Sequence, residues 1–195
     1  MTEPYYSLQI LLPTEADRKL QRWSEDMPGT SWPSWGGHIT LLSAFSWPEG
    51  FDLAATINAV MQHHRAFTLR LDQAVAEPDL TRADYRIVML TPREGGGFLR
   101  LSALQAELTQ AIIAVGADLR PELTERHYAP HLTLALSVFD AEANRIVSQA
   151  RSENLSIEFW VQAVWLLHFT PGEGTETAID RSVFTLPGSG NLLSD

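Results

Sequence analysis

Residues 38–46 read HITLLSAFS, and residues 131–139 read HLTLALSVF. Each stretch begins with a histidine, places a threonine two residues later and continues as an apolar run, a pattern typical of a central strand. The two histidines stand 93 residues apart (131 − 38). Because the stretches are so alike, the sequence predicts a duplicated unit in which each copy carries one such strand.

The segments that follow the two stretches are also alike. A helix-like segment comes next in each half, over 52–65 and over 140–152, and the triplet Gln-Ala-Val then occurs at 73–75 and at 162–164. No glycine-rich phosphate loop stands at a strand–helix junction, as a parallel nucleotide-binding sheet would require. Paired strands at the end of each half therefore favour an antiparallel α+β fold, with the two copies packed about a pseudo-two-fold axis.

Hydrophobic periodicity divides the chain into its expected elements. Strands are predicted over 5–12, 38–46, 66–76, 85–91, 131–139, 155–169 and 177–186, and helices over 15–26, 52–65, 98–115 and 140–152. Glycines 95–97 mark a lobe boundary near 92–98. We expect one bilobal domain over 1–187, in which strands can be interchanged between the lobes, and a flexible tail over 188–195.

The composition excludes several classes of protein. Of the 195 residues, 45% are apolar and 19% are charged, which indicates a folded domain and not a disordered chain. The chain has no cysteine, which excludes disulfides, thiolate zinc sites and cysteine nucleophiles and fits a cytoplasmic protein. No apolar run approaches the roughly 20 residues of a membrane span. The N-terminal residues also lack the pattern of a signal peptide.

The net charge of −10 limits the kind of partner. A protein that coats duplex nucleic acid would repel the phosphates over its whole surface, so we expect no duplex partner. A nucleotide or an RNA end needs only a few local donors and remains compatible with this charge. We expect a monomer that binds a ligand of this small size.

The two histidines and two threonines carry the candidate chemistry. Side chains alternate along a strand, so His38 shares a face with Thr40, and His131 shares a face with Thr133. If a pseudo-two-fold relates the halves, the imidazoles face each other across a cleft and can divide acid and base duties near neutral pH. The threonine hydroxyls can donate to an anionic oxygen held between them. This arrangement predicts phosphoryl chemistry without a metal.

With its motifs HITL at 38–41 and HLTL at 131–134, the chain resembles the 2H phosphoesterase superfamily, which includes 2′,3′-cyclic phosphodiesterases and 2′–5′ RNA ligase-like proteins. The resemblance implies two α+β lobes with antiparallel sheets around a central cleft and helices on the outside. It also implies that the histidines are the catalytic acid and base, that the threonines bind phosphate, and that no cofactor is needed. Many ligase-like members carry an arginine just after the second motif, where this chain has Ala135-Leu136-Ser137.

Other residues near the motifs are candidates for substrate contact. Trp35 lies in the loop that leads into the first motif and could stack on a base. Tyr128 and Arg126 precede the second motif and are candidate ligand contacts. His127 and His131 have the spacing of a helical metal pair, but a proline between them disfavours a helix, so we expect no metal site.

These observations predict a metal-independent phosphodiesterase that acts on a 2′,3′-cyclic nucleotide or on a cyclic phosphate at an RNA end. One alternative is a binding module that holds a nucleotide or an RNA end without turnover. Two intact His-x-Thr pairs favour the enzyme, since binding alone does not require two titrating groups. A second alternative is 2′–5′ RNA ligation, which uses the same site but needs room for two strands.

Overall fold

Nine strands form one antiparallel sheet in the structure, a computed structural model that describes residues 4–27, 30, 32–79, 82, 84–119, 128–171 and 177–188. The strands are β1 (Tyr5–Leu11), β2 (His38–Ser46), β3 (Phe67–Pro78), β4 (Tyr85–Pro92), β5 (Asp118–Leu119), β6 (Leu132–Phe139), β7 (Ile157–Val161), β8 (Ala163–Pro171) and β9 (Thr177–Thr185). The helices of the described residues are α1 (Thr14–Glu25), α2 (Leu53–Met61), α3 (Gly96–Ala114) and α5 (Asp140–Ser152). The predicted α+β fold with antiparallel strands is confirmed.

The strand order is β7-β3-β4-β6-β2-β1-β8-β9, with β5 paired to β2. We call strands β2, β1, β8 and β9 the β2 side and strands β6, β4, β3 and β7 the β6 side. Strands β3 and β4 follow the first motif in sequence but pair beside β6, whereas β8 and β9 follow the second motif but extend the β2 side through β1. Each motif strand is therefore flanked in part by strands from the other half of the chain.

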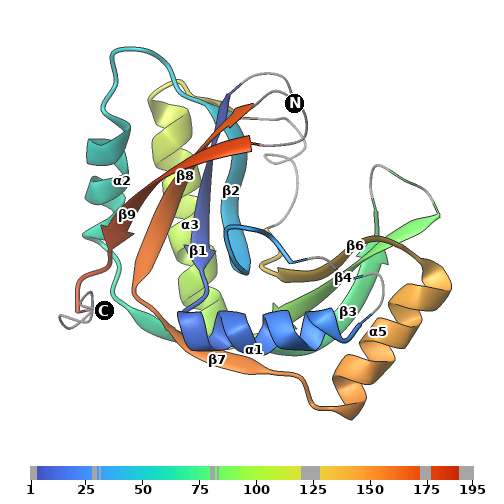
Figure 1. Ribbon diagram of the computed structural model, residues 1–195. Helices are drawn as coiled ribbons and strands as arrows, with labels where there is room; N and C mark the ends of the chain where they lie inside the picture. The colour runs from blue at the N-terminus through green and yellow to red at the C-terminus, as the bar shows by residue number, and fades with distance from the viewer. Residues whose placement is uncertain are drawn as a thin grey trace.

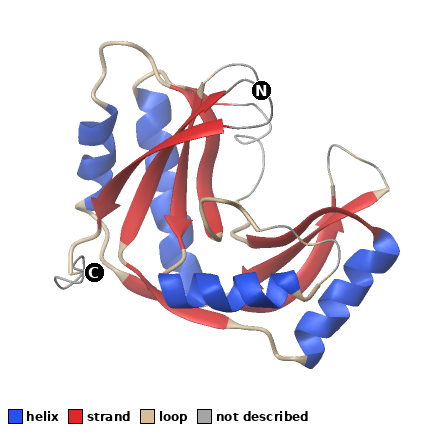
Figure 2. Cartoon of the chain, viewed as in Figure 1, coloured by secondary structure: helices blue, strands red, loops and turns tan. Residues whose placement is uncertain are grey.

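The sheet is curled, and the helices lie on its outer side (Figure 1; Figure 2 colours the same view by element type). Helices α2 and α3 pack together, with α3 against β2 and β3 and α2 against β9, while α5 packs against β3, β4 and β6. Asp52 begins α2, because its side chain accepts a hydrogen bond from the backbone N–H of Ala55. No helix of the described residues is long and apolar enough to cross a membrane.

The internal duplication extends to irregularities of the backbone. On β2, the pairing with β1 skips Leu41 and is irregular again around Ala44. On β6, the pairing with β4 skips Leu134 and is irregular again around Ser137. Ala44 and Ser137 also share a left-handed backbone, with φ of 53° and 51°. Because each bulge occurs at the same offset from its motif, the two strands bend in the same way and bury successive apolar residues.

Three predicted elements differ from the structure. The strand expected over 155–169 is two strands, β7 and β8, because at Gln162 the chain leaves the edge of β3 and joins β1. The helix expected over 52–65 ends at Met61. His63 and His64 then both bond the carboxylate of Glu107 on α3, which adjacent side chains on one helix are poorly placed to do. Residues 118–119, for which the sequence predicts neither a helix nor a strand, form the short strand β5.

Ala44, the residue of β2 with a left-handed backbone, provides a test of the bulge in that strand. Ala44→Val is expected to lower the free energy of unfolding by about 1–2 kcal/mol, because a β-branched side chain tolerates a positive φ poorly. For a chain of this size that corresponds to a Tm lower by roughly 2–8 °C in a calorimetric scan. Ala44→Gly is the matched control and should be at least as stable as the valine variant, since glycine adopts this conformation without strain. A glycine variant less stable than the valine variant would contradict the bulge.

Candidate active site

The central residues of the two motifs pair where the two sides of the sheet meet. Ile39 on β2 is the register partner of Leu132 on β6, and the two described strands pair at this position. Both side chains are fully buried. Since neighbours along a strand point to opposite faces, the histidine and threonine of each motif must project to the other face of the sheet.

That face, which we call the motif face, carries all four candidate residues. Continuing the antiparallel register by one residue in each direction places His38 across from Thr133 and Thr40 across from His131. Both histidines and both threonines are half-buried. The two histidines are therefore brought onto one face by the pairing of β2 with β6 at Ile39 and Leu132.

The two imidazoles are held in the same way. The Nδ1 atom of His38 lies 3.1 Å from the carbonyl oxygen of Gly36, and the Nδ1 atom of His131 lies 2.8 Å from the carbonyl oxygen of Ala129. A carbonyl oxygen can only accept, so each Nδ1 carries the proton in these bonds. In the neutral form of each ring, Nε2 is then the nitrogen available to accept a proton from a ligand or water.

The charge of His38 depends on its surroundings. Burial lowers the pKa of His38 below its ordinary value of 6.5, and the positive charge of His131 lowers it further. The hydrogen bond to Gly36 opposes these effects. His38 is therefore expected to be neutral at pH 7, and the two imidazoles lie near enough for one to sense the charge of the other.

Each motif is preceded by an aromatic residue three positions before its histidine. Trp35 packs on His38, with ring centroids 5.5 Å apart, and also on Phe169 of β8, with centroids 5.5 Å apart at an interplanar angle of 77°. Phe169 in turn stacks on Tyr5 at 4.8 Å. The structure thus brings the predicted residue Trp35 to the first histidine and shields that imidazole from water.

Tyr128 occupies the equivalent position before the second motif but makes a different contact. Its hydroxyl donates to the backbone carbonyl of Thr40 at 3.2 Å, and burial raises the pKa of this phenol. The segment before β6 is therefore tied directly to β2. Arg126, the other predicted ligand contact, and His127, which has the spacing of a metal pair with His131, lie outside the described residues.

Sequence reasoning missed Asp17 of α1, which holds the loop before the first motif. Its Oδ1 atom accepts from the backbone N–H of Gly37 at 2.6 Å and from Nε1 of Trp32 at 3.0 Å. A Cβ atom at Gly37 would lie 2.5 Å from the Trp32 ring, so only glycine permits this close approach. The only sequence signal was an acidic residue in the first turn of a helix, which helix dipole effects already explain.

A buried polar pair on β1 was also missed. By register, Gln9 lies across from Thr40, and it is only 4% exposed. Its Nε2 donates to Ser7, whose hydroxyl donates to the carbonyl of Leu42. The Gln9 Oε1 atom is buried and has no partner among the described residues. The available signal was the pair of polar residues at alternate positions of an otherwise apolar strand.

Comparison with known proteins identifies the family. A model of the 2′–5′ RNA ligase superfamily matches residues 12–173. The chain belongs to this superfamily. The predicted resemblance to 2H phosphoesterases is thereby confirmed. No curated protein matches the chain.

Solved structures agree with this superfamily fold. E. coli LigT complexed with 3′-AMP matches with a TM-score of 0.65 at 20% identity, covering 95% of this chain and 99% of LigT. The LigT complex with NADP+ gives a TM-score of 0.61 at 21% identity, covering 94% and 98%. TT0787 of Thermus thermophilus gives 0.62 at 18% identity, covering 96% and 99%. At these identities the matches show a shared fold.

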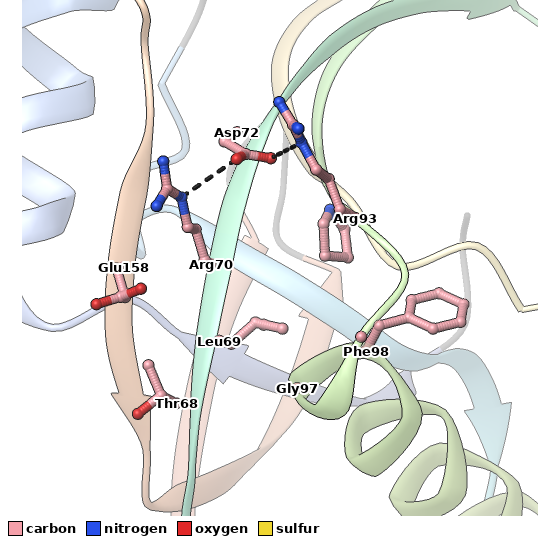
Figure 3. Close-up of a pocket in the computed structure, with 10 residues that line it drawn as sticks. Thr68, Leu69, Arg70, Asp72, Arg93, Gly97, Phe98 and Glu158 are labelled. Carbon is pink, nitrogen blue, oxygen red and sulfur yellow. Dashed lines mark hydrogen bonds and ion pairs between the residues drawn. The ribbon is translucent and has the colours of Figure 1, made fainter.

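A cavity of this superfamily member lies apart from the motifs. It has a volume of about 390 Å³ and is lined by β3, β7, the end of β4 and the start of α3 (Figure 3). Asp72 forms ion pairs with both Arg70 and Arg93, and Glu158 adds a second negative charge, so the charges in this cavity balance. Within the described ranges, no group of three or more histidine, aspartate and glutamate side chains could hold a metal ion. The motif face is therefore the candidate active site.

A titration of His38 followed by NMR tests this geometry without any assay of activity. In the wild type the pKa of His38 should lie below 6.5. His131→Asn should raise it, because the charge of the second imidazole is removed, but not fully to 6.5, because burial is the larger cause. Trp35→Ala should also raise it by admitting water.

His168→Asn is the control, since His168 stacks on Tyr6 away from the motifs. This variant should leave the pKa of His38 unchanged. A His38 pKa that did not respond to His131→Asn would show that the two rings are too far apart to act together.

Proposed function

We propose that this superfamily member is a metal-independent phosphodiesterase that opens a 2′,3′-cyclic phosphate on a nucleotide or at an RNA end. The observation that carries the proposal is the pair of imidazoles, each with Nδ1 bound to a carbonyl and Nε2 available, on one face with two threonines. A nucleotide ligand is supported by the LigT complexes, which hold 3′-AMP, ATP and NADP+. Within the proposal, the roles of the four residues follow from their surroundings.

In the proposed step, Nε2 of His38 accepts a proton from water, because burial favours its neutral form. The water oxygen forms a bond to phosphorus, and the bond between phosphorus and O3′ breaks. Protonated His131 gives its proton to O3′, which leaves a 2′-phosphate and a 3′-hydroxyl. Thr40 and Thr133 donate to the non-bridging oxygens, on which charge rises in the transition state.

The aromatic residues at the motifs receive supporting roles. Trp35 shields the imidazole of His38 from water. It also offers an aromatic surface on which a nucleobase near the motif face can stack. Tyr128 acts as a positioning residue, because its hydroxyl is bonded to the Thr40 carbonyl and holds the two motifs together. Contact between Arg126 and the substrate stays a prediction from sequence.

Phosphorus NMR on chelator-treated protein tests the activity directly. Incubation with the four nucleoside 2′,3′-cyclic phosphates should convert at least one of them to a 2′-phosphate. The rate should survive EDTA and should not rise with added zinc, magnesium or manganese, since imidazoles supply the acid and the base. Loss of activity on chelation, restored by one metal, would overturn the two-histidine step.

The same experiment separates the proposal from its alternatives. Saturable binding of a cyclic phosphate without any product would indicate a binding module. A linked product that forms only when an oligonucleotide with a free 5′-hydroxyl is added would indicate 2′–5′ ligation. A 3′-phosphate product would indicate that the same acid and base break the bond between phosphorus and O2′ instead of the bond to O3′.

Variants of the two histidines test which one is the acid. His38→Ala and His131→Ala should each lower turnover of a cyclic phosphate by about 10²–10⁴-fold while leaving the thermal unfolding cooperative. A diester with a p-nitrophenolate leaving group needs no proton from the enzyme. This substrate should therefore restore most of the activity of His131→Ala and little of the activity of His38→Ala.

The dependence of turnover on pH should also distinguish the proposed base, His38, from the proposed acid, His131. Because the pKa of His38 is lowered, the acid limb of the wild-type profile should have its midpoint below pH 6.5, and His38→Ala should lose that limb. Rescue of the His38 variant by the activated diester would reverse the assignment of acid and base.

A further inference from the structure

The motif face continues well beyond the four motif residues on the β6 side. Met89 of β4 is the register partner of Thr133, so its side chain lies on the motif face. The alternation along β4 places Ile87 and Tyr85 on the same face. The intervening residues Val88 and Leu90 are fully buried on the opposite face, which α5 covers.

An aromatic cluster stands at the outer end of this row. Tyr85 is the register partner of Phe139, and their ring centroids lie 4.5 Å apart. The guanidinium of Arg82 lies over the Tyr85 ring, 4.4 Å from its centroid. Phe139 is 61% exposed, although it is a large apolar residue. We call Arg82, Tyr85 and Phe139 the distal platform.

The distal platform lies at a distance that a short nucleotide strand can span. Met89 and Tyr85 are four residues apart on β4, which corresponds to about 14 Å along the strand. At about 3.4 Å per stacked nucleotide, this distance equals about four nucleotides, and fewer when the strand is stretched. Figure 1 shows that β6 runs from its contact with β2 outward to the start of α5, where Phe139 lies.

We propose that the distal platform stacks a base of the same RNA strand whose terminal cyclic phosphate lies between the histidines. This inference rests on the proposed function and extends it, because it makes an oligonucleotide end a better substrate than a mononucleotide. Exposed aromatic rings bind single-stranded bases by stacking, and an arginine plane beside them stacks as well and can pair with a phosphate. Such binding relies on a few local contacts and so is compatible with the net charge of −10.

A length series of substrates tests the platform. The substrates are uridine 2′,3′-cyclic phosphate and oligouridylates of two, four and six nucleotides that end in the same group. In the wild type, kcat/KM should rise with length by about 5- to 150-fold, the effect of one base–aromatic stack, and should level off near four nucleotides. Phe139→Ala should abolish this rise while leaving kcat/KM for the mononucleotide within two-fold.

Phe51→Ala is the matched control, because Phe51 is a phenylalanine of similar exposure, 55%, in the loop before α2. It should leave the whole series unchanged. Phe139→Leu keeps the apolar volume but removes the aromatic face, so it should resemble Phe139→Ala even if the alanine variant is unstable. Equal kcat/KM for all lengths, or an equal loss for mononucleotide and oligonucleotide, would overturn the platform.

The platform and the proposed function can fail separately. If the wild type opens no cyclic phosphate, the proposed function fails, and the platform is judged by fluorescence anisotropy with a labelled six-nucleotide RNA that ends in a 2′-phosphate. Weaker binding to Phe139→Ala by the same 5- to 150-fold would support the platform. Equal binding to the wild type and to this variant would overturn it.

Discussion

The pairing of Ile39 with Leu132 is the contact on which the rest of the structure depends. This pair lies between β2 and β6 and joins the β2 side of the sheet to the β6 side. Each of these two side chains is fully buried, which contributes about 1.5–3 kcal/mol per residue. A slip of one residue in either strand would turn a histidine and a threonine into the core, where their polar groups would lose water. The burial of two aliphatic residues thus holds the site in register.

Duplication explains how the two motif strands, which are far apart in sequence, both contribute to the motif face. The motif strands have bulges at the same offsets, a left-handed residue at the same position, and a histidine bonded to the carbonyl two residues before it. The strands that follow each motif then pair with the other motif's side of the sheet. Neither half could bury its motif strand on its own in this arrangement, so the site and the core form together.

Local patterns made most of the fold predictable, including the antiparallel α+β class and both motif strands. The split of 155–169 into β7 and β8 could not be predicted, because the change of partner at Gln162 is a property of the whole sheet and leaves no local mark. That each histidine shares a face with its threonine could be predicted, because side chains alternate between the two faces of a strand. Asp17, Gln9 and the Tyr128–Thr40 bond were not predicted, since they depend on contacts between residues far apart in sequence.

The two His-x-Thr motifs are alike in sequence, but the residues packed around their histidines differ. An acid–base pair requires such a difference, because one imidazole must be neutral while the other is protonated. Two imidazolium charges on one small face repel each other, so protonation of one ring disfavours protonation of the other. If the two motifs had identical surroundings, a single added proton would bind either imidazole equally well. At the position three residues before each histidine, however, Trp35 packs on the imidazole of His38, whereas Tyr128 reaches across to the carbonyl of Thr40. Burial of His38 favours the neutral form of this imidazole, and the proposed mechanism therefore assigns the role of base to His38 and the role of acid to His131. In the proposed mechanism, this difference between Trp35 and Tyr128 is what gives the two copies of the motif different chemical roles.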